Sequence, residues 1–264
     1  MSQAVGSGRS RRGRPIELGG ALVTLVEPHR GHEVAYNRWY EQDHFYAGCM
    51  IGAWTMSGAR YVCTRDLKAL RYPANSPVCP EPSAGSYLAL YWILNGRFGD
   101  WITWSTDQVK WLIAEDRMFE HRDHIHTLMY RFRAELGGSD AVPVELALDH
   151  RSPYLVMVIG RPAPGTDLDA VDDWFRSRAA QAAVVAELTP VPMHAGAPSD
   201  VPRDEATDRF LQLWFVDDDI HDVWDERFAG LGREFAATGL GELVFVSPFR
   251  ATVPGTDTFA DQLW

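Results

Sequence analysis

His44, Tyr40 and Tyr36 lie four residues apart within residues 32–50, a segment whose aromatic residues have helical spacing. Side chains at positions i, i+4 and i+8 lie along one face of a helix, so two phenols and an imidazole would face a common volume. Histidine titrates near neutral pH and suits general acid–base catalysis, and phenols can donate hydrogen bonds to a developing oxyanion. These three residues are therefore the candidate catalytic residues. The alternative is a histidine at a packed helix end, hydrogen-bonded to the backbone.

A second polar cluster occupies residues 120–126, which contain three histidines and two carboxylates. In a strand, His124 and His126 would share one face and could chelate a metal; in a helix, His121 and His124 could do so. A catalytic zinc usually has three protein ligands, and no third ligand is evident in the sequence. We therefore predict no metal and place His126 among the candidate substrate-binding residues. The alternative is a polar junction at the start of a strand.

Three further side chains are candidates for binding a substrate. Trp39 lies in the same predicted helix as His44, and Trp104 lies in a predicted helix over residues 101–118, where either could form an apolar wall of a pocket. Arg60 could pair with an anionic substrate group. The alternatives are core packing for the tryptophans and a surface position or a structural ion pair for Arg60.

The elements needed to position these residues occur in the same order twice along the chain. In the first half, strands are predicted over residues 19–27, 52–63, 86–94 and 124–133, and helices over 32–50 and 101–118. In the second half, strands are predicted over residues 154–160, 188–194, 210–216 and 243–249, and helices over 168–183 and 219–238. Each half therefore has the order β-α-β-β-α-β.

This order predicts an α+β fold with two tandem ferredoxin-like repeats. Each repeat would form a four-stranded antiparallel sheet with both helices on one face, and the two uncovered apolar faces would pack against each other. We expect a disordered tail over residues 1–17, an N-terminal repeat over 18–137 and a C-terminal repeat over 150–264.

Residues 37–44 (Asn-Arg-Trp-Tyr-Glu-Gln-Asp-His) look like the W-Y-x-x-x-H helix of EthD-like proteins, and residues 58–61 (Gly-Ala-Arg-Tyr) look like the pattern on the next strand of that group. Residues 254–264 are similar to the C-terminal tails of two-repeat proteins of this kind. The chain thus resembles the dimeric α/β-barrel superfamily over residues 18–264. The resemblance implies an intramolecular barrel. It leaves the function open, because the superfamily includes cofactor-free monooxygenases, polyketide cyclases, lactone isomerases and haem-dependent enzymes.

The first helices of the two repeats differ in their polar residues. Residues 174–179 align with residues 39–44 and keep the tryptophan, but Phe175 lacks the hydroxyl of its counterpart and Ala179 stands in the place of His44. A side chain needed only for packing would be kept in both repeats. We therefore expect one active site, in the N-terminal repeat.

Composition narrows the class of protein. The chain has 264 residues, and its formal net charge of −11 argues against a nucleic-acid partner. No apolar run approaches the roughly 18 residues of a membrane span, and the arginine-containing N-terminal segment has no apolar stretch of a secretory signal, so a cytoplasmic location is expected. The three cysteines form no C-x-x-C pair, which argues against a disulfide framework or a structural zinc site.

The motifs of P-loop hydrolases, dinucleotide-binding dehydrogenases, zinc proteases and nucleophile-elbow hydrolases do not occur in the sequence. We predict a cofactor-independent enzyme that acts on a hydrophobic, ring-containing small molecule in the N-terminal repeat, as an isomerase, cyclase, dehydratase or monooxygenase. The expected state is a monomer or homodimer. One alternative is a haem protein with His44 or His124 as axial ligand. The other is a non-catalytic protein that binds a small ligand.

Overall fold

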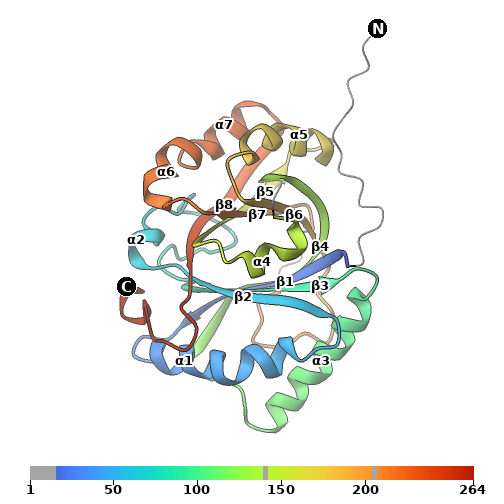
Figure 1. The fold of residues 1–264 in the computed structure, drawn as a ribbon, viewed down its shortest axis with the longest axis vertical. Helices are drawn as coiled ribbons and strands as arrows, with labels where there is room; N and C mark the ends of the chain where they lie inside the picture. Colours follow the sequence, from blue (N-terminus) through green and yellow to red (C-terminus); the bar gives the residue numbers. More distant parts are fainter. Residues whose placement is uncertain (1–15, 139–141, 204–206) are drawn as a thin grey trace.

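The computed structural model describes residues 16–138, 142–203 and 207–264, so nearly all of the predicted tail over residues 1–17 lies outside the described residues. Eight antiparallel strands form one closed barrel in the order β1-β3-β2-β8-β5-β7-β6-β4 (Figure 1). The strands are β1 (Leu18–Pro28), β2 (Thr55–Val62), β3 (Tyr87–Leu94), β4 (Arg122–Gly138), β5 (Tyr154–Pro162), β6 (Val184–Pro190), β7 (Phe210–Val216) and β8 (Gly241–Ala251). The predicted α+β fold with two ferredoxin-like repeats is confirmed.

Helices cover the outer face of each sheet (Figure 1). The first sheet carries α1 (Glu33–Trp39), the π-helix η1 (Tyr40–Met50) and α3 (Phe98–Ala114); the second carries α5 (Leu168–Ala179), α6 (Ile220–Arg227) and α7 (Leu231–Ala237). Four short helices lie in connections and in the C-terminal tail: α2 (Arg65–Lys68), η2 (Val144–Leu146), α4 (Ala147–His150) and η3 (Ala260–Gln262).

The two sheets meet along two unequal seams. The β4–β6 seam runs from the pair Tyr130–Pro190 to the pair Gly138–Val184. The β2–β8 seam consists of only the pairs Tyr61–Ala251 and Val62–Arg250. The two sheets are therefore joined by a long ladder of residue pairs on one side of the barrel and by only two pairs on the other.

The barrel interior is filled by apolar side chains from both sheets and by the linker between the repeats. Val144, Ala147 and Leu148 of the linker are buried in the same core as Trp92 and Phe215. The indole Nε1 of Trp92 donates a hydrogen bond of 2.9 Å to the carbonyl of Val144. The linker thus contributes to the core that joins the repeats.

Two predicted helices differ from those of the structure, one by an interruption and one in length. The helix predicted over residues 219–238 is interrupted after Arg227, where Phe228 is buried against Trp224 and Trp214. The helix predicted over residues 168–183 ends at Ala179 because the chain turns there to begin β6 at Val184, whose Cα partner on β7 is Phe215. The alanine-rich sequence favours helix, but pairing within the sheet decides the boundary.

The prediction that His124 and His126 would share a strand face is wrong. Pairing between β1 and β4 shifts by one residue, because Leu25 lies opposite His126 while Val26 lies opposite His124. Ile125 is the extra residue of this β-bulge, and a bulge moves the following side chains to the other face. His124 therefore faces the helices, whereas His126 is buried among residues that face the barrel interior.

A buried carboxyl pair lies beneath α5 in the second repeat. Glu187 on β6 is fully buried, accepts a hydrogen bond of 2.9 Å from Gln212 and lies near Asp172 of α5. Burial, reinforced by the Asp172 carboxyl, raises the pKa of Glu187 to about 9. Glu187 therefore keeps its proton at neutral pH in the folded protein.

This proton predicts a pH-dependent stability. Between the ordinary glutamate pKa of 4.5 and the folded value of about 9, the unfolded chain releases a proton that the folded chain retains, so the free energy of unfolding falls as pH rises through this window. Glu187→Gln removes this contribution. We expect its free energy of unfolding, from urea titrations at about pH 6 and about pH 8.5, to fall less than that of the wild type. The exposed substitution Glu242→Gln is the control, and a parallel fall in Glu187→Gln and wild type would contradict the assignment.

Candidate functional site

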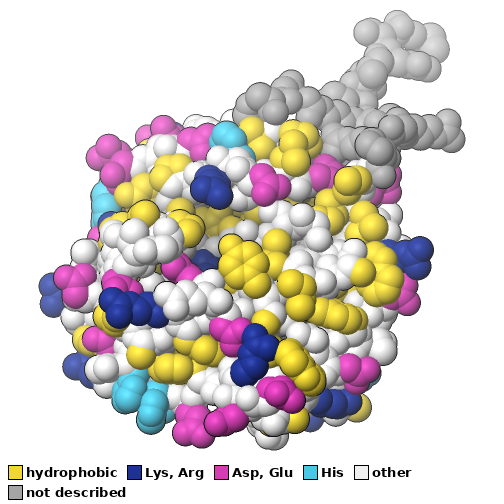
Figure 2. Space-filling view, turned by 60° about the horizontal axis from the view of Figure 1, so that its bottom comes forward, with side chains coloured by type: hydrophobic (Ala, Val, Ile, Leu, Met, Phe, Trp, Pro, Cys, Tyr) yellow, Lys and Arg dark blue, Asp and Glu magenta, His cyan; other side chains and the backbone are white. Residues whose placement is uncertain are grey.

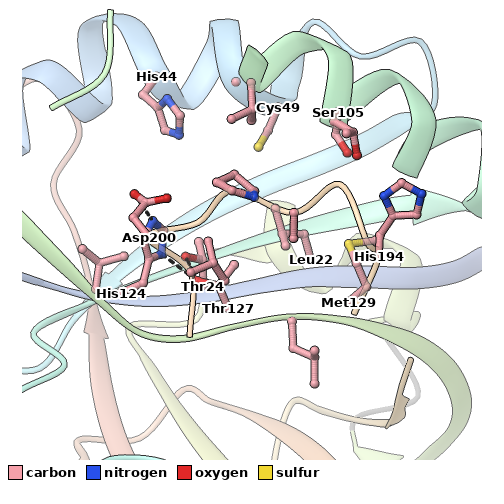
Figure 3. Close-up of a pocket in the computed structure, with 18 of the residues that line it drawn as sticks. Leu22, Thr24, His44, Cys49, Ser105, His124, Thr127, Met129, His194 and Asp200 are labelled. Atoms are coloured by element: carbon pink, nitrogen blue, oxygen red, sulfur yellow. Dashed lines mark hydrogen bonds and ion pairs between the residues drawn. The ribbon is translucent and has the colours of Figure 1, made fainter. Parts of the chain in front are cut away.

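A cavity of about 160 Å³ lies between the helices η1 and α3 and the strands β1 and β4 of the first repeat (Figure 3). In Figure 3, His44, His124, Asp200, Thr24 and Thr127 gather toward one end of the cavity, and Met129, His194 and Ser105 lie toward the other. Further apolar lining comes from Leu22, Val26, Trp101, Ile102, Val109, Met118, Leu128, Met193 and Val201. The cavity thus combines an apolar wall with a compact group of polar side chains.

His44 reaches the cavity from the π-helix η1. Its imidazole stacks on Trp39, five residues earlier, with ring centroids 4.6 Å apart, and π-helical hydrogen bonding also links residues five apart. A β-carbon on Gly48 would lie 3.0 Å from the imidazole Cε1, so glycine leaves the space that the ring occupies. These contacts fix the ring on the helix face that lines the cavity.

The imidazole of His44 is buried and neutral. Burial lowers its pKa to about 3, and the positive charge of Arg122 lowers it further. The adjacent carboxylate of Asp43 is paired with Arg117. The Nδ1 atom of His44 is buried and has no hydrogen-bond partner among the described residues. The ring therefore offers an unused polar atom inside the repeat.

His124 faces the cavity from β4 and belongs to a chain of hydrogen bonds. Its Nδ1 lies 2.8 Å from Thr127 Oγ1, which lies 2.7 Å from Thr24 Oγ1. Its Nε2 lies 3.8 Å from the carboxylate of Asp200. Burial, followed by the charge of Arg122, lowers the pKa of His124 to about 4, whereas Asp200 acts in the opposite direction. The ring is neutral at physiological pH and has a carboxylate close to one nitrogen.

Asp200 comes from the second repeat. It lies in the β6–β7 loop, which lines the cavity with Met193, His194 and Val201. The carboxylate pairs with Arg122 of β4 at 3.2 Å. Sequence analysis missed Asp200 because it lies in a Gly-, Pro- and Asp-rich segment that indicates only a loop, and its partners are about 75 residues away along the chain.

The predicted catalytic residues are only partly brought together. Tyr40 and His44 line the cavity. The hydroxyl of Tyr40 forms a 2.9 Å hydrogen bond with the hydroxyl of Tyr91, and burial raises the pKa of Tyr40, so it remains protonated. Tyr36 is buried behind the cavity, where its ring packs against Tyr40 and Tyr87.

The four predicted binding residues lie outside the cavity lining. Trp39 supports His44 from behind, and its Nε1 donates to the carbonyl of Arg117. Trp104 packs against Trp101. His126 is inside the barrel, with its Nε2 2.7 Å from the hydroxyl of Tyr130. Arg60 lines a separate cleft.

No protein-family model matches the sequence, and no curated protein matches it. Solved structures do resemble it. A chlorite dismutase-like protein is 11% identical, with 94% of this chain and 100% of that chain aligned and a TM-score of 0.52. An anthrone oxidase-like protein is 11% identical, with 92% and 98% of the two chains aligned and a TM-score of 0.51.

This is the dimeric α/β-barrel fold. In this barrel both repeats belong to one chain, and the two sheets take the places of two subunits. At this level of identity the likeness concerns the fold, because many functions share it.

The histidine cavity of this barrel does not fit haem. A cavity of about 150 Å³ holds a single benzene ring, whereas haem contains four pyrrole rings in one macrocycle. The larger cleft around Arg60 contains no histidine, cysteine or methionine among its lining residues. Within the three described segments of the chain, no group of three or more histidine, cysteine or carboxylate side chains is arranged to hold a metal ion.

The outer surface has a mixed character. On the face drawn in Figure 2, acidic, basic and hydrophobic side chains are interspersed, with no continuous basic surface among the coloured residues. None of the helices in the described part of the chain has the length and apolar character of a membrane span.

The burial of both imidazoles predicts how they titrate. Because the folded pKa values of His44 and His124 are lowered to about 3 and about 4, both rings stay neutral between about pH 8 and about pH 5. Side-chain NMR of ¹⁵N-labelled histidines should show two rings with constant shifts over this range, assigned by their loss in His44→Ala and His124→Ala. Titration of either ring near pH 6.5 would contradict the buried site.

Proposed function

We propose that the chain is a cofactor-independent enzyme that transfers a proton on a hydrophobic, single-ring substrate bearing a carbonyl or hydroxyl group. The observation that carries this proposal is the pair of neutral, buried imidazoles that come from η1 and β4 toward one end of a ring-sized cavity (Figure 3). The cavity volume of about 160 Å³ is close to the roughly 150 Å³ of a cavity that accepts benzene. The ring would lie among the apolar side chains, with its oxygen toward the histidines.

His124 acts as the general base. With Nδ1 donating to Thr127, the lone pair of Nε2 is free to take a proton from the substrate. The imidazolium that forms lies 3.8 Å from the Asp200 carboxylate, which stabilises the new positive charge. Asp200 thus acts on the charge of the base, whereas Thr127 holds the ring through Nδ1.

His44 acts as the hydrogen-bond donor to the substrate oxygen. The nearest carboxylate in sequence, Asp43, is neutralised by Arg117, and burial keeps the imidazole uncharged. A neutral imidazole can polarise a carbonyl and stabilise the enolate that forms when a neighbouring C–H bond loses its proton. The positive charge of Arg122, which acts on both histidines, favours the same anionic intermediate.

The fold is compatible with this proposal and does not select the reaction. The two similar structures are named for a chlorite dismutase-like and an anthrone oxidase-like protein, which are both descriptions of small-molecule enzymes. The cavity volume limits the size of the substrate to about one ring. It leaves the predicted reaction types, which are isomerase, cyclase, dehydratase and monooxygenase, open.

The test is proton exchange on a simple probe. ¹H NMR measures how fast the acidic C–H protons of cyclohexenone exchange with deuterium from D₂O. The rate is measured in the presence of the wild type, His44→Ala, His124→Ala or Asp200→Asn. We expect the wild type to accelerate exchange, and loss of either histidine to slow the catalysed rate by about 10²-fold or more. Asp200→Asn should lower the rate and shift its pH dependence, because the imidazolium loses its carboxylate.

The control is His221→Ala, which removes an exposed histidine of α6 that pairs with Asp66 and does not line the cavity. It should exchange protons like the wild type. Equal rates in the wild type and both cavity variants would refute the catalytic roles. Binding of the ring without accelerated exchange would indicate a ligand-binding protein.

A further inference from the structure

A second cleft opens where the barrel seam is short. Beside the two residue pairs that join β2 to β8, a cleft of about 910 Å³ separates the first helix layer from the linker between the repeats. The C-terminal tail after β8 runs alongside α1 and forms one wall (Figure 1). The volume lies within the roughly 300–1,000 Å³ of small-molecule sites.

Arg60 contributes to the lining of this cleft from β2. Its side chain is only 4% exposed and lies over the ring of Tyr40, with the guanidinium carbon 4.5 Å from the ring centroid. Its Nη1 donates to Asn37 at 2.9 Å and to Glu41 at 3.1 Å. Its Nη2 is buried and has no hydrogen-bond partner among the described residues. A buried donor without an acceptor is costly, so an oxyanion at the cleft floor would be stabilised there.

Arg151 lies on the linker side of the cleft. It follows α4 with φ of 59°, a left-handed conformation that favours glycine. The guanidinium is exposed, and the described part of the chain provides no ion-pair partner for it. A long cationic side chain is thus held at a strained position on the rim of the cleft, where it can meet an anion.

The other charges of the cleft are largely compensated. Arg38 pairs with Asp257 at 2.5 Å, and Arg250 pairs with Asp66 at 3.1 Å. The carboxylate of Glu41 is engaged by Arg60 and by the backbone N–H of Gly255. Asp149 accepts a hydrogen bond from the neutral hydroxyl of Ser57 and keeps its charge. Among the described residues that line the cleft, Arg151 is therefore a cation without an ion-pair partner. Arg60 is paired with Glu41 through Nη1, and its Nη2 is left as a donor without a partner.

We propose that this cleft binds an amphipathic organic anion. Its carboxylate or phosphate group would be held between Arg60 and Arg151, and its apolar body would pack against Phe45 and Phe259, which also line the cleft. In a chain of net charge −11, the unpaired guanidinium of Arg151 and the unpaired Nη2 donor of Arg60 would favour anions that the rest of the surface repels. The site is separate from the histidine cavity and does not depend on the proposed proton transfer.

The test is calorimetric titration of the full chain with benzoate and with phenyl phosphate, using benzyl alcohol as the neutral analogue. The key variant is Arg151→Gly, which removes the cation and relieves the left-handed strain, so it should fold at least as well as the wild type. We expect both anions to bind the wild type and to lose about tenfold or more in affinity for Arg151→Gly. In Arg60→Gln, the loss of affinity should be larger for the two anions than for benzyl alcohol.

His44→Ala separates this site from the histidine cavity. Anion binding should be unchanged in His44→Ala, whatever that variant does to proton exchange. The proposal is overturned by absence of anion binding to the wild type, by equal affinity in Arg151→Gly, or by loss of binding in His44→Ala alone. A stronger effect of Arg151→Gly on phenyl phosphate than on benzoate would identify the phosphate as the preferred group within the proposal.

Discussion

The burial of two apolar sheet faces against each other is the interaction on which the rest of this structure depends. It closes the barrel, and because both sheets belong to one chain, the two seams are free to differ. The long β4–β6 seam brings the β6–β7 loop of the second repeat over the cavity of the first, and this loop supplies Asp200. The short β2–β8 seam leaves the second cleft beside it. Both candidate sites are therefore consequences of how the sheets are joined.

The helix layers of the two repeats have the same architecture, but the space between helix and sheet is filled differently. In the first, a π-helix, Gly48 and the small side chains of Thr24 and Thr127 leave room for two imidazoles and a ring-sized space. In the second, Phe175 packs against Phe210, Trp214 and Phe235, so aromatic rings occupy the layer between helix and sheet. Ala179, which stands in the place of His44, is buried in the same core as Phe175.

The fold could be predicted from the sequence because its main signals are local. Apolar strands such as Phe210–Val216 and the repeated element order are visible without any knowledge of contacts. His44 and Tyr40 were found because helical spacing places them on one face. The β-bulge at Ile125 and the partnership of Asp200 with Arg122 leave no local signal, since each depends on pairing between distant segments. Arg60 was predicted as a possible anion partner from its residue type alone. The separate cleft that it lines depends on the pairing of β2 with β8 and could not be predicted from the sequence.

The central claim is that the cavity between η1 and β4 receives one ring with its oxygen toward His44 and His124. A crystal structure of the protein with bound phenol tests this most directly, because phenol has the size of the cavity and a single polar group. The account predicts one phenol among Trp101, Met129 and Leu22, with its hydroxyl within hydrogen-bond distance of an imidazole. Phenol bound elsewhere, or a cavity closed by side chains with His44 and His124 directed away from it, would contradict the account.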